Sequence, residues 1–360
     1  MKRFFSKTLD KFFGRGEESI FVPPMDGPLK PNEILDKINV IRTVPEVDNL
    51  CNIGKKVICS SGSDLLEINQ KITLLKRFTS KITSIAFHKE TQQLAVAIHE
   101  GRILIINTNN FEEVLEIKQD CVTSMCYSKK ELFLTVGSSK FSTEDWQSDL
   151  MTLGGTGCLM KCKLSGSRPE KILDNLSWPS GVLISEANLI FLTESWKHRI
   201  RAFKFDESST TLGEPSTILE KLPAYPGRIF SDKSKDQIWV AFFAPRNQLV
   251  EFVLTETEYR EKMIASVDKE YWVSPCLRSG KSIKEPLQYS GIKTMGYLKP
   301  WAPAFSYGLF VKYDNNLNAI QSYHSRTNGF FHGTNSLAID KNGKILVSST
   351  GDGKIGYLNG

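Results

Sequence analysis

The chain has 360 residues, enough for one large domain or for two of ordinary size, so length alone leaves the domain count open. Its hydrophobic fraction of 40% and charged fraction of 24% are typical of a soluble globular protein. The net charge of +6 is modest and is spread along the chain without a long basic stripe, which argues against a nucleic-acid-binding protein.

The first 18 residues have apolar side chains at helical spacing. Five of them share one face of a predicted helix: Phe4, Phe5, Leu9, Phe12 and Phe13. Such a helix packs on its own domain or on a partner, or it lies on a membrane surface. The segment lacks the apolar run and the small-residue cleavage site of a secretory signal. No run of 18 apolar residues occurs in the sequence, so we expect no membrane-spanning helix.

Seven cysteines occur in the sequence, and the odd number argues against a disulfide framework. Cys121 and Cys126, and likewise Cys158 and Cys162, have spacings that superficially suggest metal ligands. Both pairs fall in strand-like stretches, and we interpret these thiols as small buried hydrophobic groups. Free thiols and the lack of a secretory signal together predict a cytoplasmic protein.

Six segments of the sequence repeat one plan: a small or polar residue, a short apolar strand, a polar turn, a second apolar strand and, after a gap, a third. The segments begin at Val47, Ile82, Val122, Pro179, Pro226 and Gly333. Repeats of roughly 40–50 residues with several short strands predict the blades of a propeller. One small twisted sheet cannot bury both faces, whereas six arranged radially can, and they also protect their edges.

We therefore predict an all-β fold, a six-bladed β-propeller at residues 41–360, preceded by a partly helical tail at residues 1–40. The blades are expected to begin near residues 48, 83, 123, 180, 227 and 334. Insertions at about 140–155 and about 255–305, the second helix-like at its start, leave the repeat plan and are expected as loops or lids at one end. Residues 306–325 are expected to supply outer strands.

Five stretches resemble, in order, blades of the strictosidine synthase-like family. They are SSKFSTEDWQSDL with GGTGCLMKCKL, LIFLTESWKHRIRAFKF, LPAYPGRI, IWVAFFAPRNQLVEF and SYHSRTNGFFHGTNSLAIDKNGKILVSSTGDGKIGYL. The second contains that family's fourth-blade pattern of an acidic residue, a small residue, Trp, any residue, His and Arg, here from Glu194 to Arg199. The resemblance covers about residues 45–360 and extends to gluconolactonases, senescence marker protein (regucalcin) and paraoxonases. It implies a functional pocket at the mouth of the central channel.

The hydrolases of this superfamily hold a divalent cation at that mouth through residues at the start of the inner strands. The cation polarises a lactone carbonyl. At the matching positions this sequence has Asp48, Thr123, Ser180 and Arg228. One carboxylate, two hydroxyls and a guanidinium disfavour Ca²⁺ or another divalent cation. The resemblance thus implies a degenerate, metal-poor cage and no required cofactor.

Strictosidine synthase itself lacks the metal and condenses an amine with an aldehyde, using a glutamate of the closing blade as its acid–base group. The matching residue in this sequence is Thr334. The group that would deprotonate the amine is therefore absent, which weakens this condensation as a candidate activity.

Two residues have alternative interpretations. Arg228 either faces the mouth, where its guanidinium would hold a carboxylate or phosphate, or points to solvent from a loop. His332 precedes the last inner strand and is either a general base near neutral pH or a loop histidine bonded to backbone. Asp48 is the other candidate for the general base.

The remaining candidates lie beside these positions. Residues expected to contact a substrate are Asn49, Thr123, Ser180, Arg228, Thr334 and Asn335. Trp178 and Tyr225 precede inner strands and are expected to form aromatic walls. Asp145 and Trp146, in the first insertion, are either lid contacts or anchors of the loop.

Some chemistries are disfavoured outright, because the sequence has no Gly-rich phosphate loop, no Gly-x-Ser-x-Gly and no His-x-x-x-His. We expect hydrolysis of a small, anionic lactone or ester at a metal-poor site. One alternative is a non-catalytic propeller that binds a small molecule or a protein partner. The other is the amine–aldehyde condensation.

Overall fold

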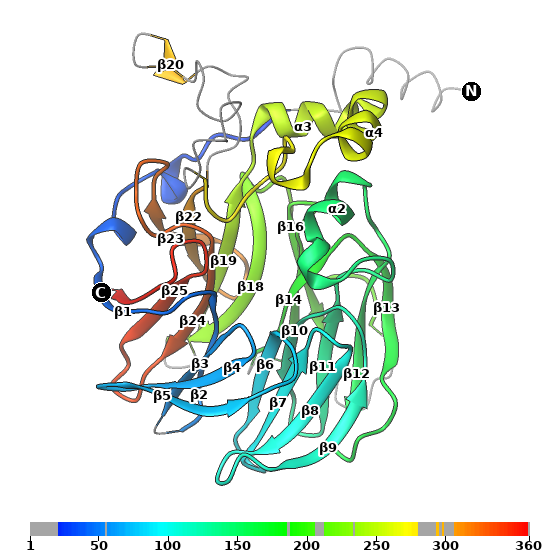
Figure 1. Cartoon of the computed structure of the whole chain (residues 1–360), viewed down its shortest axis with the longest axis vertical. Helices are drawn as coiled ribbons and strands as arrows, with labels where there is room; N and C mark the ends of the chain where they lie inside the picture. The colour runs from blue at the N-terminus through cyan, green and yellow to red at the C-terminus, as the bar shows by residue number, and fades with distance from the viewer. Residues whose placement is uncertain are drawn as a thin grey trace.

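The computed structural model describes residues 21–360 apart from 55, 186–187, 206–211, 233–234, 280–292, 295–296, 299–305 and 359–360. The predicted N-terminal helix falls outside the described residues. Within them, six four-stranded antiparallel sheets are arranged as blades around a central axis (Figure 1). The prediction of a mainly β, six-bladed propeller with few helices is confirmed.

The first three blades use consecutive strands. Blade 1 has β2 (Val47–Asn52), β3 (Val57–Ser61), β4 (Asp64–Ile68) and β5 (Ile72–Arg77). Blade 2 has β6 (Ile82–His88), β7 (Gln93–Ile98), β8 (Arg102–Asn107) and β9 (Glu113–Lys118). Blade 3 has β10 (Val122–Tyr127), β11 (Glu131–Val136), β12 (Gly157–Lys163) and β13 (Glu170–Leu176).

The last three blades include an insertion and the ring closure. Blade 4 has β14 (Pro179–Ile184), β15 (Leu189–Glu194), β16 (Arg199–Lys204) and β17 (Thr217–Leu219). Blade 5 has β18 (Ala224–Asp232), β19 (Gln237–Pro245), β22 (Gly308–Tyr313) and β23 (Ala319–Ser325). Blade 6 has β24 (Thr334–Ile339), β25 (Ile345–Ser349), β26 (Lys354–Leu358) and β1 (Asn39–Thr43). Because β1 pairs with β26, the two ends of the propeller close in one sheet, and residue 40 falls inside the last blade.

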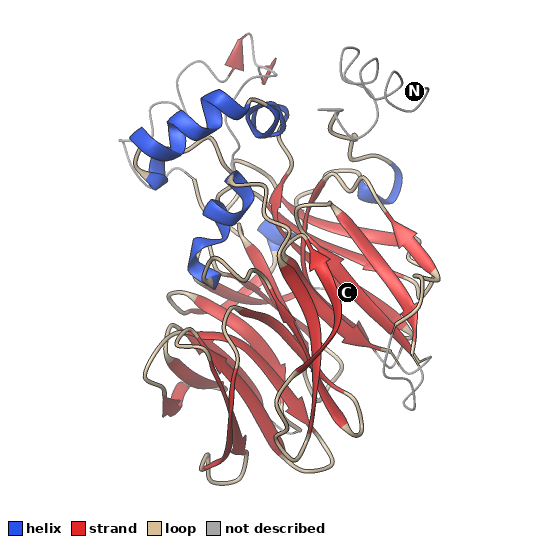
Figure 2. Cartoon of the chain, turned by 90° about the vertical axis from the view of Figure 1, so that its right-hand side faces the viewer, coloured by secondary structure: helices blue, strands red, loops and turns tan. Residues whose placement is uncertain are grey.

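The helices gather at one end of the sheets (Figure 2). They are η2 (Gly27–Leu29), η3 (Leu35–Lys37), η4 (Thr143–Asp145), α2 (Trp146–Met151), α3 (Gln248–Thr255), α4 (Thr257–Ser266) and η5 (Lys269–Tyr271). A two-stranded hairpin, β20 (Lys293–Thr294) and β21 (Tyr297–Leu298), follows. Among the described residues, no helix has the length and apolar character needed to cross a membrane.

The core lies between neighbouring blades, as expected for sheets that bury both faces. One cluster joins blades 2 and 3 and includes Ala97, Leu134, Cys158 and Cys162. Cys158 and Cys162 are free thiols, and burial raises the pKa of Cys162 to about 11. Cys158 and Cys162 are therefore buried side chains of the core, which confirms their interpretation as hydrophobic groups.

Buried hydroxyl groups connect neighbouring blades near the axis. Thr123 Oγ1 donates to Pro179 O at 2.5 Å, and Thr193 Oγ1 donates to Gly227 O at 2.7 Å. Thr334 Oγ1 lies 2.9 Å from Phe242 O and accepts from Leu309 N at 3.1 Å. Pro179 and Gly227 lie on inner strands, which have no partner strand on the side of the axis, so the hydroxyls of Thr123 and Thr193 satisfy carbonyl groups at a sheet edge.

Replacing Thr334 with Val keeps the shape of the side chain but leaves the Phe242 and Leu309 backbone groups without this hydroxyl. Thr334 is fully buried, and water cannot substitute there. We expect Thr334→Val to lower the free energy of unfolding by about 2–4 kcal/mol in urea denaturation. Thr73→Val, at an exposed position of β5, is the matched control and should change it by less than about 0.5 kcal/mol. Equal effects of the two substitutions would contradict the bridging role.

Candidate functional site

Every inner strand has a register shift near its start. The shifts fall between Asp48 and Cys51, Ile82 and Ser84, Val122 and Ser124, Pro179 and Gly181, Pro226 and Ile229, and Thr334 and Ser336. A β-bulge re-aims a side chain out of the regular alternation. One residue at each shift lines a common cavity: Asp48, Thr83, Thr123, Ser180, Arg228 and Asn335.

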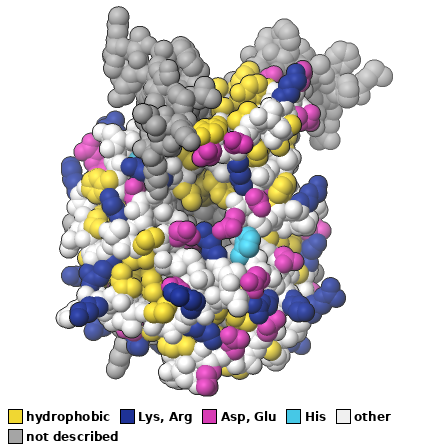
Figure 3. Space-filling model, in the orientation of Figure 1, with side chains coloured by type: hydrophobic (Ala, Val, Ile, Leu, Met, Phe, Trp, Pro, Cys, Tyr) yellow, Lys and Arg dark blue, Asp and Glu magenta, His cyan; other side chains and the backbone are white. Residues whose placement is uncertain are grey.

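This cavity lies at the end of the central channel where the inner strands begin, and its volume is about 380 Å³. Its charged lining consists of Glu46, Asp48, Lys81, Glu144 and Arg228. Its apolar lining includes Trp146, Trp178, Phe243 and Leu277. Figure 3 shows the hollow on this face, with acidic and basic side chains next to each other along its margin. The cavity thus has both charged and aromatic lining groups.

Two of the charged lining residues, Asp48 and Arg228, form an ion pair across the channel. Arg228 Nη1 contacts Asp48 Oδ1, and Arg228 Nη2 donates to Thr83 O at 2.7 Å. Only 14% of the Arg228 side chain and 18% of the Asp48 side chain are exposed. Arg228 therefore faces the cavity, the first of the two arrangements considered for it. Two buried atoms beside the pair, Arg228 Nε and Thr83 Oγ1, have no hydrogen-bond partner among the described residues.

Two of the lining hydroxyls, those of Thr123 and Ser180, are already engaged with protein groups. Thr123 Oγ1 donates to Pro179 O, as described above. Ser195 Oγ donates to Pro226 O at 2.7 Å, so the 2.6 Å contact between Ser180 Oγ and Ser195 Oγ has Ser180 as the donor. No histidine of the described chain lines the cavity to accept a proton from either hydroxyl. Neither group is set up as a nucleophile.

The rim of the cavity is a network around one lysine. Lys81 Nζ lies 3.1 Å from Glu46 Oε2 and 3.4 Å from Glu144 Oε1. Burial alone would lower the pKa of Lys81, but hydrogen bonds and charges from the two glutamates outweigh it and raise the pKa. The network joins the loops of blades 1 and 2 to the insertion of blade 3.

The insertions contribute directly to the cavity. Trp146, at the start of α2, lines it, whereas the neighbouring Asp145 does not. Asp145 Oδ1 instead pairs with Lys269 Nζ at 3.0 Å, and its pKa is lowered by hydrogen bonds from Lys269 and Ser142. Asp145 thus anchors one insertion to the other, while Trp146 takes the lid position.

Four expected positions are corrected by the geometry. Asn49 is buried and donates to Ser60 Oγ at 2.9 Å, because its backbone is left-handed (φ 56°) and turns it into the blade. Thr334 holds the neighbouring blade, and the next residue, Asn335, lines the cavity. Tyr225 is fully buried behind Phe243, with its hydroxyl donating to Glu251 at 3.3 Å. The fourth is His332.

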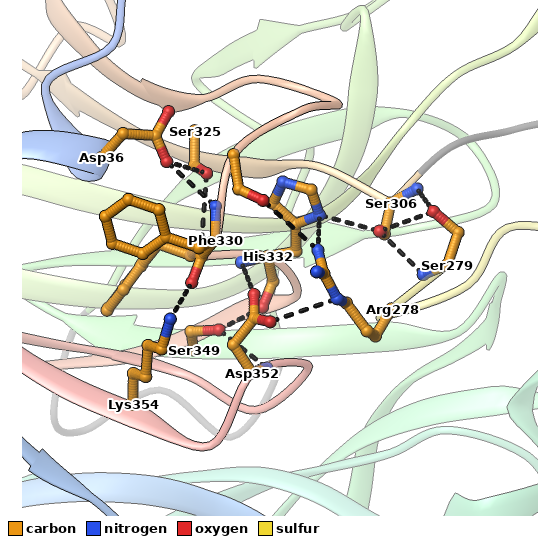
Figure 4. Close-up of polar contacts among 12 residues, drawn as sticks. Asp36, Arg278, Ser279, Ser306, Ser325, Phe330, His332, Ser349, Asp352 and Lys354 are labelled. Carbon is orange, nitrogen blue, oxygen red and sulfur yellow. Dashed lines mark hydrogen bonds and ion pairs between the residues drawn. The ribbon is translucent and has the colours of Figure 1, made fainter. Parts of the chain in front are cut away.

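His332 belongs to a buried polar cluster beside the cavity (Figure 4). Its Nε2 donates to Arg326 O at 2.7 Å, so Nδ1 is the acceptor for Arg278 Nη1 at 2.8 Å. Arg278 Nε also lies 3.1 Å from Asp352 Oδ1. His332 therefore does not reach the channel mouth. It holds Arg278, whose neighbour Leu277 covers the cavity.

Sequence reasoning missed several lining residues. Thr83 occupies the same place in its repeat as Thr123, and this signal was sufficient to find it. Glu46, Lys81 and Glu144 lie in loops, where the strand repeat gives no signal. Phe243 lies on a second strand, and Leu277 comes from the larger insertion. Their place at the cavity depends on tertiary packing alone.

The donor set of the mouth does not fit a divalent cation. The described residues contain no group of three or more His, Cys, Asp or Glu side chains arranged to hold a metal ion. Of the three lining carboxylates, Asp48 contacts a guanidinium, and Glu46 and Glu144 contact an ammonium group. A hard cation needs several converging oxygen ligands, and a fixed arginine charge repels it.

The fold and this cavity define a six-bladed propeller with a ligand-sized cavity at one end of its channel. A family model described as the SMP-30/gluconolactonase/LRE-like region matches residues 66–282. The chain therefore belongs to the SMP-30/gluconolactonase/LRE-like family, a family that includes gluconolactonases. A comparison with curated proteins gave no match.

Two solved structures share the fold at low sequence identity. Regucalcin from Agrobacterium tumefaciens, described as a calcium-binding protein, is 10% identical, with a TM-score of 0.55 over 89% of this chain and 93% of that one. A luciferin-regenerating enzyme is 11% identical, with a TM-score of 0.54 over 91% of this chain and 94% of that one. At these identities the likeness concerns the fold alone.

The buried histidines predict an acid-sensitive stability. Burial lowers the pKa of His332 and of His198, and it lowers the pKa of His324 to about 4. In the unfolded chain a histidine titrates near 6.5. Below that pH the unfolded state binds protons that the folded state does not, so the free energy of unfolding falls as pH falls from 7 to 5. Each such histidine contributes up to about 1.4 kcal/mol per pH unit.

His332→Gln should make the free energy of unfolding depend less steeply on pH, by an amount that corresponds to at most one proton. Urea denaturation at several pH values measures this dependence. The substitution will also lower stability at pH 7, so the slope and not the absolute value is the readout. An unchanged slope in the variant would contradict a neutral His332 in the folded protein.

Proposed function

We propose that this chain hydrolyses a small ester or lactone in the mouth cavity, without a divalent cation. The observation that carries the proposal is the Asp48–Arg228 pair. It brings a carboxylate and a fixed positive charge together inside a cavity of small-molecule size, from positions 180 residues apart in the chain. Membership of a family that includes gluconolactonases supports the same reaction class.

In the proposed reaction, Asp48 is the general base. Asn49 N and Arg228 Nη1 both contact Asp48 Oδ1, which leaves Oδ2 for a water molecule. The water oxygen attacks the acyl carbon while the carboxylate takes its proton. The acyl–oxygen bond then breaks, and the leaving alkoxide recovers that proton.

Arg228 is the proposed electrophile. Its Nη atoms each carry a second hydrogen beyond the contacts to Asp48 and Thr83, and these can donate to the oxyanion of the tetrahedral intermediate. The same guanidinium can hold the carboxylate of the product. In this proposal the guanidinium supplies the positive charge for which a cation would otherwise be needed, so no cofactor is required.

Water is the proposed nucleophile because the hydroxyls of Thr123 and Ser180 are engaged and no histidine of the described chain lines the cavity to activate another hydroxyl. The proton of Thr123 goes to Pro179 O of the next blade, and that of Ser180 goes to Ser195 Oγ. The same observation favours one second candidate, a propeller that binds its ligand without turnover. The amine–aldehyde condensation that the strictosidine synthase-like resemblance suggests has no support from the site, because Thr334 is buried against backbone.

The decisive experiment combines metal analysis with a panel of lactones and esters, using chelator-treated wild type and Asp48→Asn. We expect turnover that survives chelation and falls by about 10²–10⁴-fold in kcat for Asp48→Asn, the range for loss of a general base. Asp64→Asn is the matched control, because Asp64 pairs with Arg77 at an exposed site outside the cavity. It should leave kcat unchanged.

Two outcomes would overturn the proposal. Hydrolysis that disappears on chelation and returns with Ca²⁺ would assign the reaction to a bound cation. Ligand binding without turnover of any panel member would favour the binding protein.

A further inference from the structure

The aromatic residues that line the cavity come from three distant parts of the chain. Trp146 comes from α2, Trp178 from the residue before β14, and Phe243 from β19. Trp146 and Phe243 meet edge to face with ring centroids 5.5 Å apart. We refer to these three rings as the aromatic wall of the cavity.

A half-buried tryptophan, Trp196, packs against this wall. Trp196 stacks on Trp178 with centroids 5.5 Å apart and lies 6.3 Å from both Trp146 and Phe243. Its Nε1 donates to Asp149 Oδ1 at 2.8 Å. Asp149 is almost completely buried, and burial raises the pKa of its carboxyl group. Trp196 thus has a single defined position, and it holds the lining rings in place.

The backbone also accommodates the wall. Trp178 adopts a left-handed conformation (φ 52°), which is unfavourable for a bulky residue and persists only where surrounding contacts impose it. Gly137 packs against the same ring, where a Cβ atom would lie 3.2 Å from two ring carbons and 2.9 Å from Thr123 Cγ2. Space for the indole is therefore provided at Gly137, and the strain is concentrated at the residue that lines the cavity.

We infer that the ligand of this cavity carries an aromatic ring next to its ester or lactone carbonyl, the ring packing on Trp146, Trp178 and Phe243. The hydrolysis of such a ligand rests on the proposed function, whereas its binding to the aromatic wall does not. A rigid apolar wall favours a rigid apolar group, because neither partner loses much conformational freedom on binding. A polyhydroxylated sugar lactone would lose water from its hydroxyls there without gaining partners.

The turnover experiment compares dihydrocoumarin, an aromatic δ-lactone, with δ-valerolactone and δ-gluconolactone. We expect wild type to have a kcat/KM for dihydrocoumarin at least tenfold above that for the other two, the difference residing in KM. Trp178→Ala should lower kcat/KM for dihydrocoumarin by about tenfold or more and that for δ-valerolactone by less than threefold. Equal losses on both lactones, or a wild-type preference for gluconolactone, would overturn the inference.

Trp196→Phe tests the positioning role. It keeps a ring at this position but removes the bond to Asp149, and Asp149→Asn keeps an acceptor for Trp196 Nε1. We expect a raised KM for dihydrocoumarin with unchanged kcat in Trp196→Phe, and near-normal KM in Asp149→Asn. Phe252→Ala, at an exposed aromatic of α3 outside the cavity, is the matched control and should change neither. A change confined to kcat would contradict a positioning role.

A binding experiment separates this inference from the hydrolase proposal. Calorimetry with 3-phenylpropanoate and hexanoate measures the two acids without any turnover. We expect at least tenfold tighter binding of the aromatic acid, lost in Trp178→Ala. If no lactone is hydrolysed but this difference is found, the inference stands and the hydrolase proposal fails. If the two acids bind equally, the inference fails whatever the turnover result.

Discussion

Neighbouring blades of this propeller are held together at the axis by hydrogen bonds from Ser and Thr hydroxyls to backbone groups of the next blade. Thr123 reaches Pro179 O, Thr193 reaches Gly227 O, and Thr334 reaches Phe242 O. Pro179 O and Gly227 O lie on inner strands, which belong to separate sheets and have no strand partner on the side of the axis. Water would have to enter the channel to satisfy them. The hydroxyls make that unnecessary and allow the blades to approach closely.

This arrangement limits which residues remain for chemistry. A hydroxyl whose proton is committed to a neighbouring carbonyl is a poor nucleophile, which applies to Thr123 and to Ser180. The bulge at the start of each inner strand nevertheless turns one side chain toward the common cavity. Where that side chain is charged, as at Asp48 and Arg228, it is available to a ligand. The structural hydroxyls and the charged pair therefore occupy equivalent repeat positions with different roles.

The sequence was sufficient to predict the propeller, because the strand repeat is a local signal that does not depend on how the blades pack. It also predicted that Asp48, Thr123, Ser180 and Arg228 lie at equivalent strand positions, and the structure brings them together. Of the adjacent pair Thr334 and Asn335, both expected to contact a substrate, only Asn335 lines the cavity, because a bulge there sets which position is buried and leaves no mark in the hydrophobic pattern.

Other failures have a different physical cause. His332 precedes an inner strand, as Trp178 does, and Tyr225 is the second residue of β18. Each side chain is fixed by a partner from a distant insertion, Arg278 for His332 and Glu251 for Tyr225. Nothing near these residues in the sequence specifies such partners. The same holds for Phe243 and Leu277, which reach the cavity only after the insertions have packed. Contacts between elements remote in sequence thus decide most of the site beyond the repeat.

A cation cage and an ion pair would select different ligands. A bound divalent cation can accept oxygen ligands from many directions, which suits a ligand rich in hydroxyls. A guanidinium held by Asp48 and Thr83 offers only the hydrogens that remain, in one plane and from one side. In the proposed function, recognition of the rest of the ligand comes from other lining groups, among them the rings of Trp146, Trp178 and Phe243. The ion pair would then hold the acyl group, and the aromatic wall would determine ligand choice.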